Sequence, residues 1–415
     1  DQVFRRGENL IESANNLEDA RPHHGTGVVS IAVGGQPEAH RLIGIAPGAE
    51  VITYRLESGA GPPTFYRLSA VNFVAAIADA HQAGAMALIH EYTDPNSYAG
   101  DGSSALELAI DEAHNNGVIQ VCPVGNMNVS HKHIERRQID CEEVACPPID
   151  LPLNIPRTIA LGPQMVPVDS VLMMVAVTGG RPPSVSIVSP DGATAEIELN
   201  GQPQFAGPNI FAAGIVEVTP RNTGIVNLVL YAEPAIPVGR YSLRLNQVPG
   251  NALVHGRVND MKTGWTRGVA WAEPTEGSGT ICYPSTADRC IGVGAVGGRT
   301  TFDFNDSAGF GDGSGPGELR GYSGRGPRID GDRAVDICAP DDPISAAYPD
   351  EMNLQAGLGH AGFRNFGGTS GAGPFVLGAL ALMAEAFPNE NSDERVMRLL
   401  NSADPAPMGD ETDRG

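Results

Sequence analysis

Three short motifs, far apart in the sequence, carry side chains that could together cleave an acyl bond. They are His24-Gly-Thr-Gly-Val28, Val124-Gly-Asn126 and Gly367-Gly-Thr-Ser-Gly-Ala-Gly-Pro374. A serine hydroxyl such as that of Ser370 becomes a good nucleophile when a neighbouring base removes its proton, and histidine is the usual base near neutral pH. The carboxamide of Asn126 could donate a hydrogen bond to the oxyanion that forms on attack.

Each motif also has an ordinary structural interpretation. His-Gly-Thr is common at the start of a helix, Gly-Thr-Ser-Gly is a turn and cap, and Gly-Asn is a turn. The order of all three, each at the edge of an expected strand or helix, favours the catalytic interpretation.

The elements that must position these motifs alternate in type along the first third of the chain. Apolar runs predict strands over 51–54, 86–89 and 118–121, and apolar spacing of three or four predicts a helix around 68–78. Ser104-Ala-Leu-Glu107 is a capping-box pattern that opens a second helix, which ends at Asn116-Gly117. This alternation predicts an α/β fold: a parallel sheet with helices on both faces.

The pattern changes after Pro147-Pro148. From about 149 to 260, short segments alternate at period two between turn signals, which predicts an antiparallel β-sandwich or jelly roll. The α/β pattern returns with strands over 290–296 and 334–338 and a helix over 371–387. We therefore expect a first catalytic part over 1–148, an inserted domain over 149–260 and a second catalytic part over 261–415.

Composition excludes two classes of protein. Lys+Arg total 27 and Asp+Glu total 49, a net charge of −22, so the surface repels phosphate and nucleic-acid binding is not expected. No run of ~20 apolar residues exists that would span a membrane. Two cysteine pairs, Cys141 with Cys146 and Cys282 with Cys290, could close small loops, which favours an oxidising compartment; Cys122 and Cys338 are expected as buried thiols.

Taken together, the motifs make the sequence resemble the subtilisin-like serine proteases, the subtilases. The segments that are similar to subtilase motifs are His24–Ser30, Gly44–Pro47, Gly117–Asn126, Tyr322–Pro327, Cys338–Pro340 and Gly368–Pro374. The resemblance implies a subtilisin-like fold, in which the antiparallel region is an insertion, and a serine endopeptidase acting on peptide or protein substrates. It also implies secretion or location in the cell envelope, with an N-terminal propeptide as a further expected partner.

The resemblance assigns roles residue by residue. Ser370 is expected as the nucleophile and His24 as the general base and acid. Asn126 and the backbone N–H of Ser370 are expected to form the oxyanion hole. The family's catalytic Asp is not identified: Asp1 lacks a preceding apolar strand, and Asp19 lies too close to His24. We expect that residue before Asp1. Two alternatives stay open, a pseudoprotease that acts as a binding or scaffold protein, and an acyl transferase or cyclase using the same acyl intermediate.

The substrate side departs from the family. Glu91-Tyr92-Thr93 stands where subtilases carry Ser-Leu-Gly or Ser-Trp-Gly. Glu91 is either a solvent-facing loop carboxylate or part of the peptide cleft, where it would favour basic substrate side chains. Val124 and Gly125 are expected in the primary specificity pocket, which Val124 would narrow.

No metal or other cofactor is expected from the cysteine spacing, because no CxxC pair is present. The Gly-rich acidic loop from Asp303 to Asp312 offers oxygen ligands for a structural calcium ion, with a solvated loop as the alternative. Cys122 is not expected as a nucleophile, because it lies inside a strand.

Overall fold

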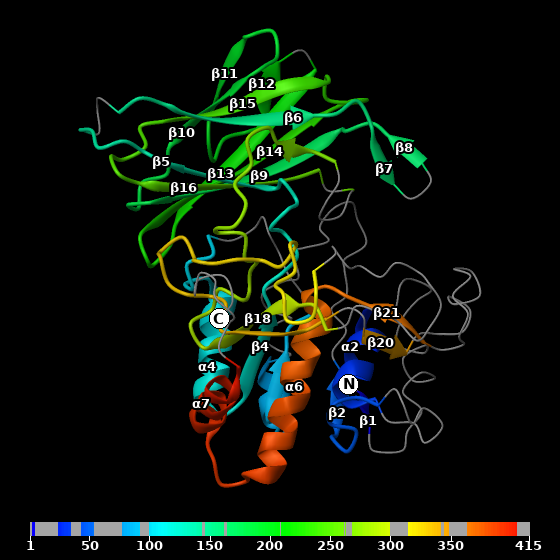
Figure 1. Ribbon diagram of the computed structural model, residues 1–415. Coiled ribbons are helices and arrows are strands. Elements are labelled where there is room, and N and C mark those ends of the chain that lie inside the picture. Colours follow the sequence, from blue (N-terminus) through cyan, green and yellow to red (C-terminus); the bar gives the residue numbers. More distant parts are fainter. Residues whose placement is uncertain are drawn as a thin grey trace.

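The computed structural model describes residues 2–4, 24–34, 43–53, 77–91, 99–142, 146–161, 164–207, 209–260, 262, 268–298, 314–341, 344–347 and 363–404. Figure 1 shows antiparallel strands gathered at one end of the molecule and parallel strands with helices at the other. The named helices of the described residues are α2 (His24–Val33), α4 (Ala105–Asn115), α6 (Thr369–Ala386) and α7 (Ser392–Ser402). A further helical segment covers residues 77–82.

Four strands form a parallel sheet in the order β19-β18-β4-β3. They are β3 (Ala87–Ile89), β4 (Ile119–Pro123), β18 (Cys290–Val296) and β19 (Ile337–Pro340). Strand β4 is buried along its whole length, as its continuous apolar run predicts. Its Ile119 and Val121 pack with α6, whereas Cys122 packs with α4. The parallel sheet is confirmed, with a later start for β19 than the sequence predicts.

The two helices on this sheet begin as their sequences dictate. Ser104 caps α4: its hydroxyl accepts the N–H of Glu107, whose carboxylate accepts the N–H of Ser104, so the predicted capping box is confirmed. Helix α6 begins after Gly368, which offers no side-chain cap. Pro374 lies inside α6 beyond its first turn, so the Ser370 carbonyl lacks the N–H that would normally bond to it.

Two antiparallel sheets form the other end of the molecule (Figure 1). The first runs in the order β11-β10-β15-β6-β17, with bounds Thr194–Ile197, Ser184–Val188, Gly239–Asn246, Ile149–Ile155 and Ala270–Trp271. The second runs in the order β12-β13-β14-β9-β16-β5, with bounds Gln204–Gly207, Ile210–Val218, Thr223–Ala232, Ser170–Thr178, Leu253–Asn259 and His133–Arg137. Strands β5 and β17 lie outside 149–260, so neighbouring segments also contribute to these sheets.

Apolar side chains from both antiparallel sheets meet in one hydrophobic cluster. In β15, Tyr241, Leu243 and Leu245 are buried and alternate with more exposed residues, which is the period-two pattern expected of a half-buried strand. Trp271 is fully buried in the same cluster, and its indole N–H donates to the carbonyl oxygen of Lys132. The antiparallel interpretation of this region is confirmed at the level of its sheets.

Three two-stranded pairs complete the described strands: β1 (Gln2–Phe4) with β2 (Val51–Thr53), β7 (Ile159–Leu161) with β8 (Gln164–Val166), and β20 (Ile344–Ala347) with β21 (Phe363–Phe366). The strand predicted at 51–54 therefore pairs antiparallel with β1 instead of joining the described part of the parallel sheet. An apolar run of three residues carries no signal that distinguishes these two partners.

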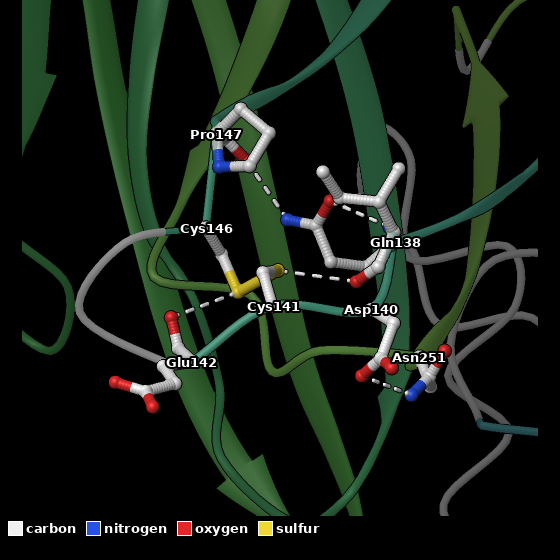
Figure 2. The surroundings of a disulfide bond; sticks show 8 residues. Gln138, Asp140, Cys141, Glu142, Cys146, Pro147 and Asn251 are labelled. Carbon is white, nitrogen blue, oxygen red and sulfur yellow. Dashed lines mark hydrogen bonds between the residues drawn. A yellow bond between two sulfur atoms is a disulfide. The ribbon is translucent and has the colours of Figure 1, made fainter.

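One of the two proposed cysteine pairs is bonded. Cys141 and Cys146 form a disulfide, next to which Gln138 bonds the carbonyl oxygen of Pro147 (Figure 2). The prediction for Cys282 and Cys290 is wrong, since neither is in a disulfide and both are buried. Cys290 instead lies within hydrogen-bonding reach of Cys122 on the neighbouring strand β4. No helix among the described residues is long and apolar enough to cross a membrane.

Candidate active site

Ser370 lies in the first turn of α6, close to the ends of the parallel strands. The turn that presents it contains Gly368 at φ +86° and ψ 174°, a conformation open almost only to glycine. The side chain of Ser370 is half-buried. A hydroxyl at a helix N-terminus has unpaired backbone N–H groups beside it, which favour the negative charge that develops during attack.

Asn126 is held directly against this turn. Its Oδ1 accepts the backbone N–H of Thr369 at 2.9 Å and the Thr369 hydroxyl at 3.2 Å. The N–H of Gly125 donates to the same hydroxyl at 3.1 Å. A methyl group built on Gly368 would lie 3.0 Å from Asn126 Nδ2, so the amide NH₂ lies beside the serine turn. The carboxamide therefore keeps its donor side available next to Ser370.

His24 opens α2, which lies beside α6 (Figure 1). Its ring packs on Phe366 with centroids 5.2 Å apart, and Phe366 ends the strand β21 that leads into the serine turn. Although the residue reaches solvent, the atoms crowded around its ring desolvate it and lower the pKa of His24. Within the described part of the chain, His24 makes no hydrogen bond to Ser370.

A buried ion pair, Asp341 with Arg320, contacts the turn at Gly368 that precedes Ser370. Asp341 Oδ2 accepts the N–H of Gly368 at 3.3 Å, and the Tyr322 hydroxyl accepts the same N–H at 3.2 Å while bonding Asp341. Arg320 Nε donates to Asp341 Oδ1 at 2.8 Å, and both side chains are fully buried. Sequence reasoning missed this network. Its one signal was an Asp directly after Cys338-Ala-Pro340, where subtilases carry Gly.

Glu91 follows β3 and reaches the same turn. Its carboxyl group is within hydrogen-bonding reach of the Ser370 side chain, and its Oε1 is buried. The solvent-facing interpretation is therefore wrong. Burial raises the pKa of Glu91 to about 8, and the contact with Ser370 opposes this rise.

The remaining substrate-side predictions divide into two groups. Val124 is fully buried and packs with Ile281, Ala334 and Val335, and Gly125 is fixed by its backbone contacts to Thr369 and Gly324. A role for Val124 and Gly125 in the substrate pocket stays a prediction. Tyr92 and Thr93 lie outside the described residues.

Two further predictions concern the family's acidic residues. The candidates Asp1 and Asp19 and the acidic loop from Asp303 to Asp312 lie outside the described residues. In the described part of the chain, no group of three or more His, Cys, Asp or Glu side chains is arranged to hold a metal ion. The third partner of the triad and the calcium site stay predictions.

A subtilase family model matches residues 1–163 and 264–414. The chain belongs to the subtilase family and is a subtilisin-like serine protease, a hydrolase. The interval between the two matched segments holds most of the antiparallel strands, from β8 to β16.

The fold agrees with that of a solved protease structure. The Clostridium perfringens CspB protease matches with a TM-score of 0.64 and 20% identity, over 94% of this chain and 77% of that chain. Sphericase matches with a TM-score of 0.41 and 14% identity over 92% and 69% of the two chains. The MycP3 protease of the type VII (ESX-3) secretion system matches with a TM-score of 0.40 and 16% identity over 92% and 67%. No curated protein matches this chain significantly.

Proposed function

We propose that this protease is an endopeptidase in which Ser370 attacks the scissile carbonyl, with His24 as general base and acid and Asn126 as oxyanion donor. The observation that carries the proposal is the pair of bonds from Thr369 to Asn126 Oδ1. Because the oxygen of this amide already accepts from two donors, its NH₂ group is left to donate to another acceptor. We infer that this acceptor is the oxyanion that forms beside Ser370. Family membership and the position of His24 on α2 support the same assignment.

The reaction follows from these positions. His24 takes the proton of Ser370 as Oγ bonds the carbonyl carbon, and the carbonyl oxygen becomes negatively charged. Asn126 Nδ2 and the N–H of Ser370 stabilise that charge without reorganising. His24 then protonates the departing amine, and water releases the acyl group by the reverse sequence.

The substrate is proposed to be an extended peptide or a protein segment. Glu91, Tyr92 and Thr93 would form the edge along which the peptide lies, and Val124 and Gly125 the wall of the primary specificity pocket. The position of Glu91 beside Ser370 supports a place in this cleft. A carboxyl group there would favour basic side chains in the substrate.

The surroundings of this site are proposed as follows. The two antiparallel sheets form a β-sandwich inserted in the catalytic domain, supported by their shared hydrophobic cluster and by the interruption of the family match. Helices cover both faces of the parallel sheet, supported by the contacts of α4 and α6 with alternate residues of β4.

The Cys141–Cys146 disulfide supports secretion or a place in the cell envelope. A propeptide and a structural calcium ion are further proposals.

A scaffold protein without turnover is the second candidate function. It is favoured by one observation, that His24 makes no hydrogen bond to Ser370 within the described residues. Catalytic hydrogen bonds in unliganded proteases often tighten only when substrate binds, which favours the enzyme.

Hydrolysis in ¹⁸O-labelled water tests the proposal. The full chain and its Ser370→Ala variant are each incubated with an unfolded protein, and the masses of the products are measured by mass spectrometry. We expect the wild-type chain, but not Ser370→Ala, to produce peptides whose new carboxyl termini carry ¹⁸O. Intact substrate would support the scaffold, and products joined to a second peptide would support the acyl transferase or cyclase.

A further inference from the structure

Glu91 occupies a position from which it can reach the reacting atom of the proposed site. It follows the parallel strand β3, which packs against α6 and β4. A methyl group built on Gly373, in the second turn of α6, would lie 3.4 Å from Glu91 Oε1. The same methyl group would lie 3.0 Å from Ile89 and from Pro123. The glycine therefore leaves room for a carboxyl group beside Ser370, which lies within its hydrogen-bonding reach.

The carboxyl group of Glu91 is buried with spare acceptor capacity. Its Oε1 has no hydrogen-bond partner among the described residues. A buried carboxylate that lacks a cation or several donors is costly, so it takes a proton readily. Burial accordingly raises the pKa of Glu91 to about 8, which is a suitable range for a group that accepts and returns a proton in this pH region.

No described neighbour neutralises this carboxyl group. His90 bonds Gln120, and burial lowers its pKa to about 4, so it is uncharged at neutral pH. On β4 the titratable group is Cys122, which packs with α4. On α6 the titratable residue is Glu385, at the far end of the helix, and on α2 it is His24. Among the described residues, Glu91 is thus a titratable group whose side chain reaches Ser370 itself, while His24 lies on the neighbouring helix α2.

We propose that Glu91 is a second catalytic base for Ser370, which takes the serine proton in turnovers where His24 does not. The O–H bond of Ser370 breaks and its proton moves to a carboxylate oxygen of Glu91, while Oγ bonds the scissile carbonyl carbon and the π electrons move to the carbonyl oxygen. When the C–N bond breaks, the departing amine takes that proton from Glu91. This inference rests on the proposed function, because it takes Ser370 as the nucleophile.

The test measures how fast a fluorophosphonate phosphonylates Ser370 between pH 6.5 and 9. Fluoride leaves without needing a proton, so the rate reports removal of the serine proton alone. In the His24→Ala variant we expect labelling that rises roughly 30-fold over this range, which is the change in ionised fraction of a group with a pKa of about 8. Adding Glu91→Gln to that variant should abolish the rise and lower the rate at pH 9 by ~10² or more.

Two control variants make the result decisive. Glu112→Gln changes an exposed carboxylate on α4 and should leave the rate unchanged. Glu91→Ser restores the residue type of the family and serves as a second variant in case the amide of Glu91→Gln disturbs folding. It should abolish the rise with pH as Glu91→Gln does. An unchanged profile after both Glu91 substitutions would overturn the inference, as would a change confined to preference for Lys or Arg substrates. Absence of labelling in the wild-type chain at every pH would overturn the proposed function as well.

Discussion

Asn126 and Thr369, 243 positions apart in the chain, are joined by a 2.9 Å hydrogen bond from the Thr369 N–H to Asn126 Oδ1. Together with the hydrogen bonds of the Thr369 hydroxyl to Asn126 and Gly125, this bond fixes the segment after β4 to the start of α6, where Ser370 lies. Because the amide oxygen is the acceptor, the amide nitrogen is left to donate, as the proposed oxyanion role requires. The orientation of Asn126 is therefore a consequence of its neighbour.

Asn126→Asp separates these two roles of the side chain. The substitution keeps an oxygen for Thr369 and removes the Nδ2 donor, so we expect kcat to fall by ~10²–10³, as when other subtilases lose this Asn, with little change in KM. Steady-state kinetics on a peptide substrate measures both. Asn128→Asp, at a buried Asn two residues on that bonds Gly321 and Gly277, is the matched control. A kcat within twofold of wild type for Asn126→Asp would contradict the oxyanion role.

Gly368→Ala adds a methyl group at 3.0 Å from Asn126 Nδ2 in a backbone conformation that suits glycine. We expect a loss of roughly 1–3 kcal/mol in the free energy of unfolding and a large fall in kcat. Gly84→Ala is the control, because Gly84 has φ +74° but open space around it. Urea unfolding should show a cost of about 1 kcal/mol there, with kcat unchanged. Equal kcat values for the two variants would argue against a tightly fitted serine turn.

Asp341→Ala leaves the buried guanidinium of Arg320 without its described carboxylate partner. Because removing one partner of a buried ion pair weakens the compensation of the other charge, we expect the free energy of unfolding to fall by about 3–5 kcal/mol. The N–H of Gly368 also loses an acceptor, so kcat should fall as well, by up to ~10². Asp332→Ala removes a 72% exposed carboxylate paired with Arg328 and should cost under about 1 kcal/mol. Similar losses in the two variants would remove Asp341 from its supporting role.

His90 should make the protein less stable in acid. Burial lowers its folded pKa to about 4, below the value near 6.5 of an unfolded chain, so the unfolded state binds more protons between these values. The contribution of His90 to the free energy of unfolding is therefore complete above pH 6.5 and is lost as the pH falls toward 4. The free energy of unfolding should decrease by about 2–3 kcal/mol between pH 7.5 and 4.5 for this reason. Urea titrations at both pH values should show a smaller difference for His90→Gln than for wild type, whereas exposed His81→Gln should not change it. An unaltered difference in His90→Gln would refute this contribution.

The sequence predicts the parts of the fold that depend on periodicity and caps. The continuous apolar run of β4, the alternation in β15 and the capping box at Ser104 each specify a local structure, and all three are present. The contact between the Asn126 and Ser370 motifs follows from strand ends that meet at one edge of a parallel sheet.

Contacts between single buried side chains could not be predicted in this way. The reach of Glu91 to Ser370 and the pairing of Asp341 with Arg320 depend on how distant loops pack, and a lone carboxylate in a sequence carries no sign of its burial. The same reason explains the wrong pairing of Cys282 with Cys290, since Cys290 reaches the neighbouring strand instead.

Mass spectrometry of the full chain after reaction with a fluorophosphonate tests the central claim most directly. We expect one covalent phosphonate, located on Ser370 by fragmentation and lost in Ser370→Ala. Labelling should be slowed by ~10²–10³ in Asn126→Asp, because the phosphonyl oxygen needs the same donor. An unmodified Ser370, or modification of another residue at equal rate, would contradict the assignment of the nucleophile.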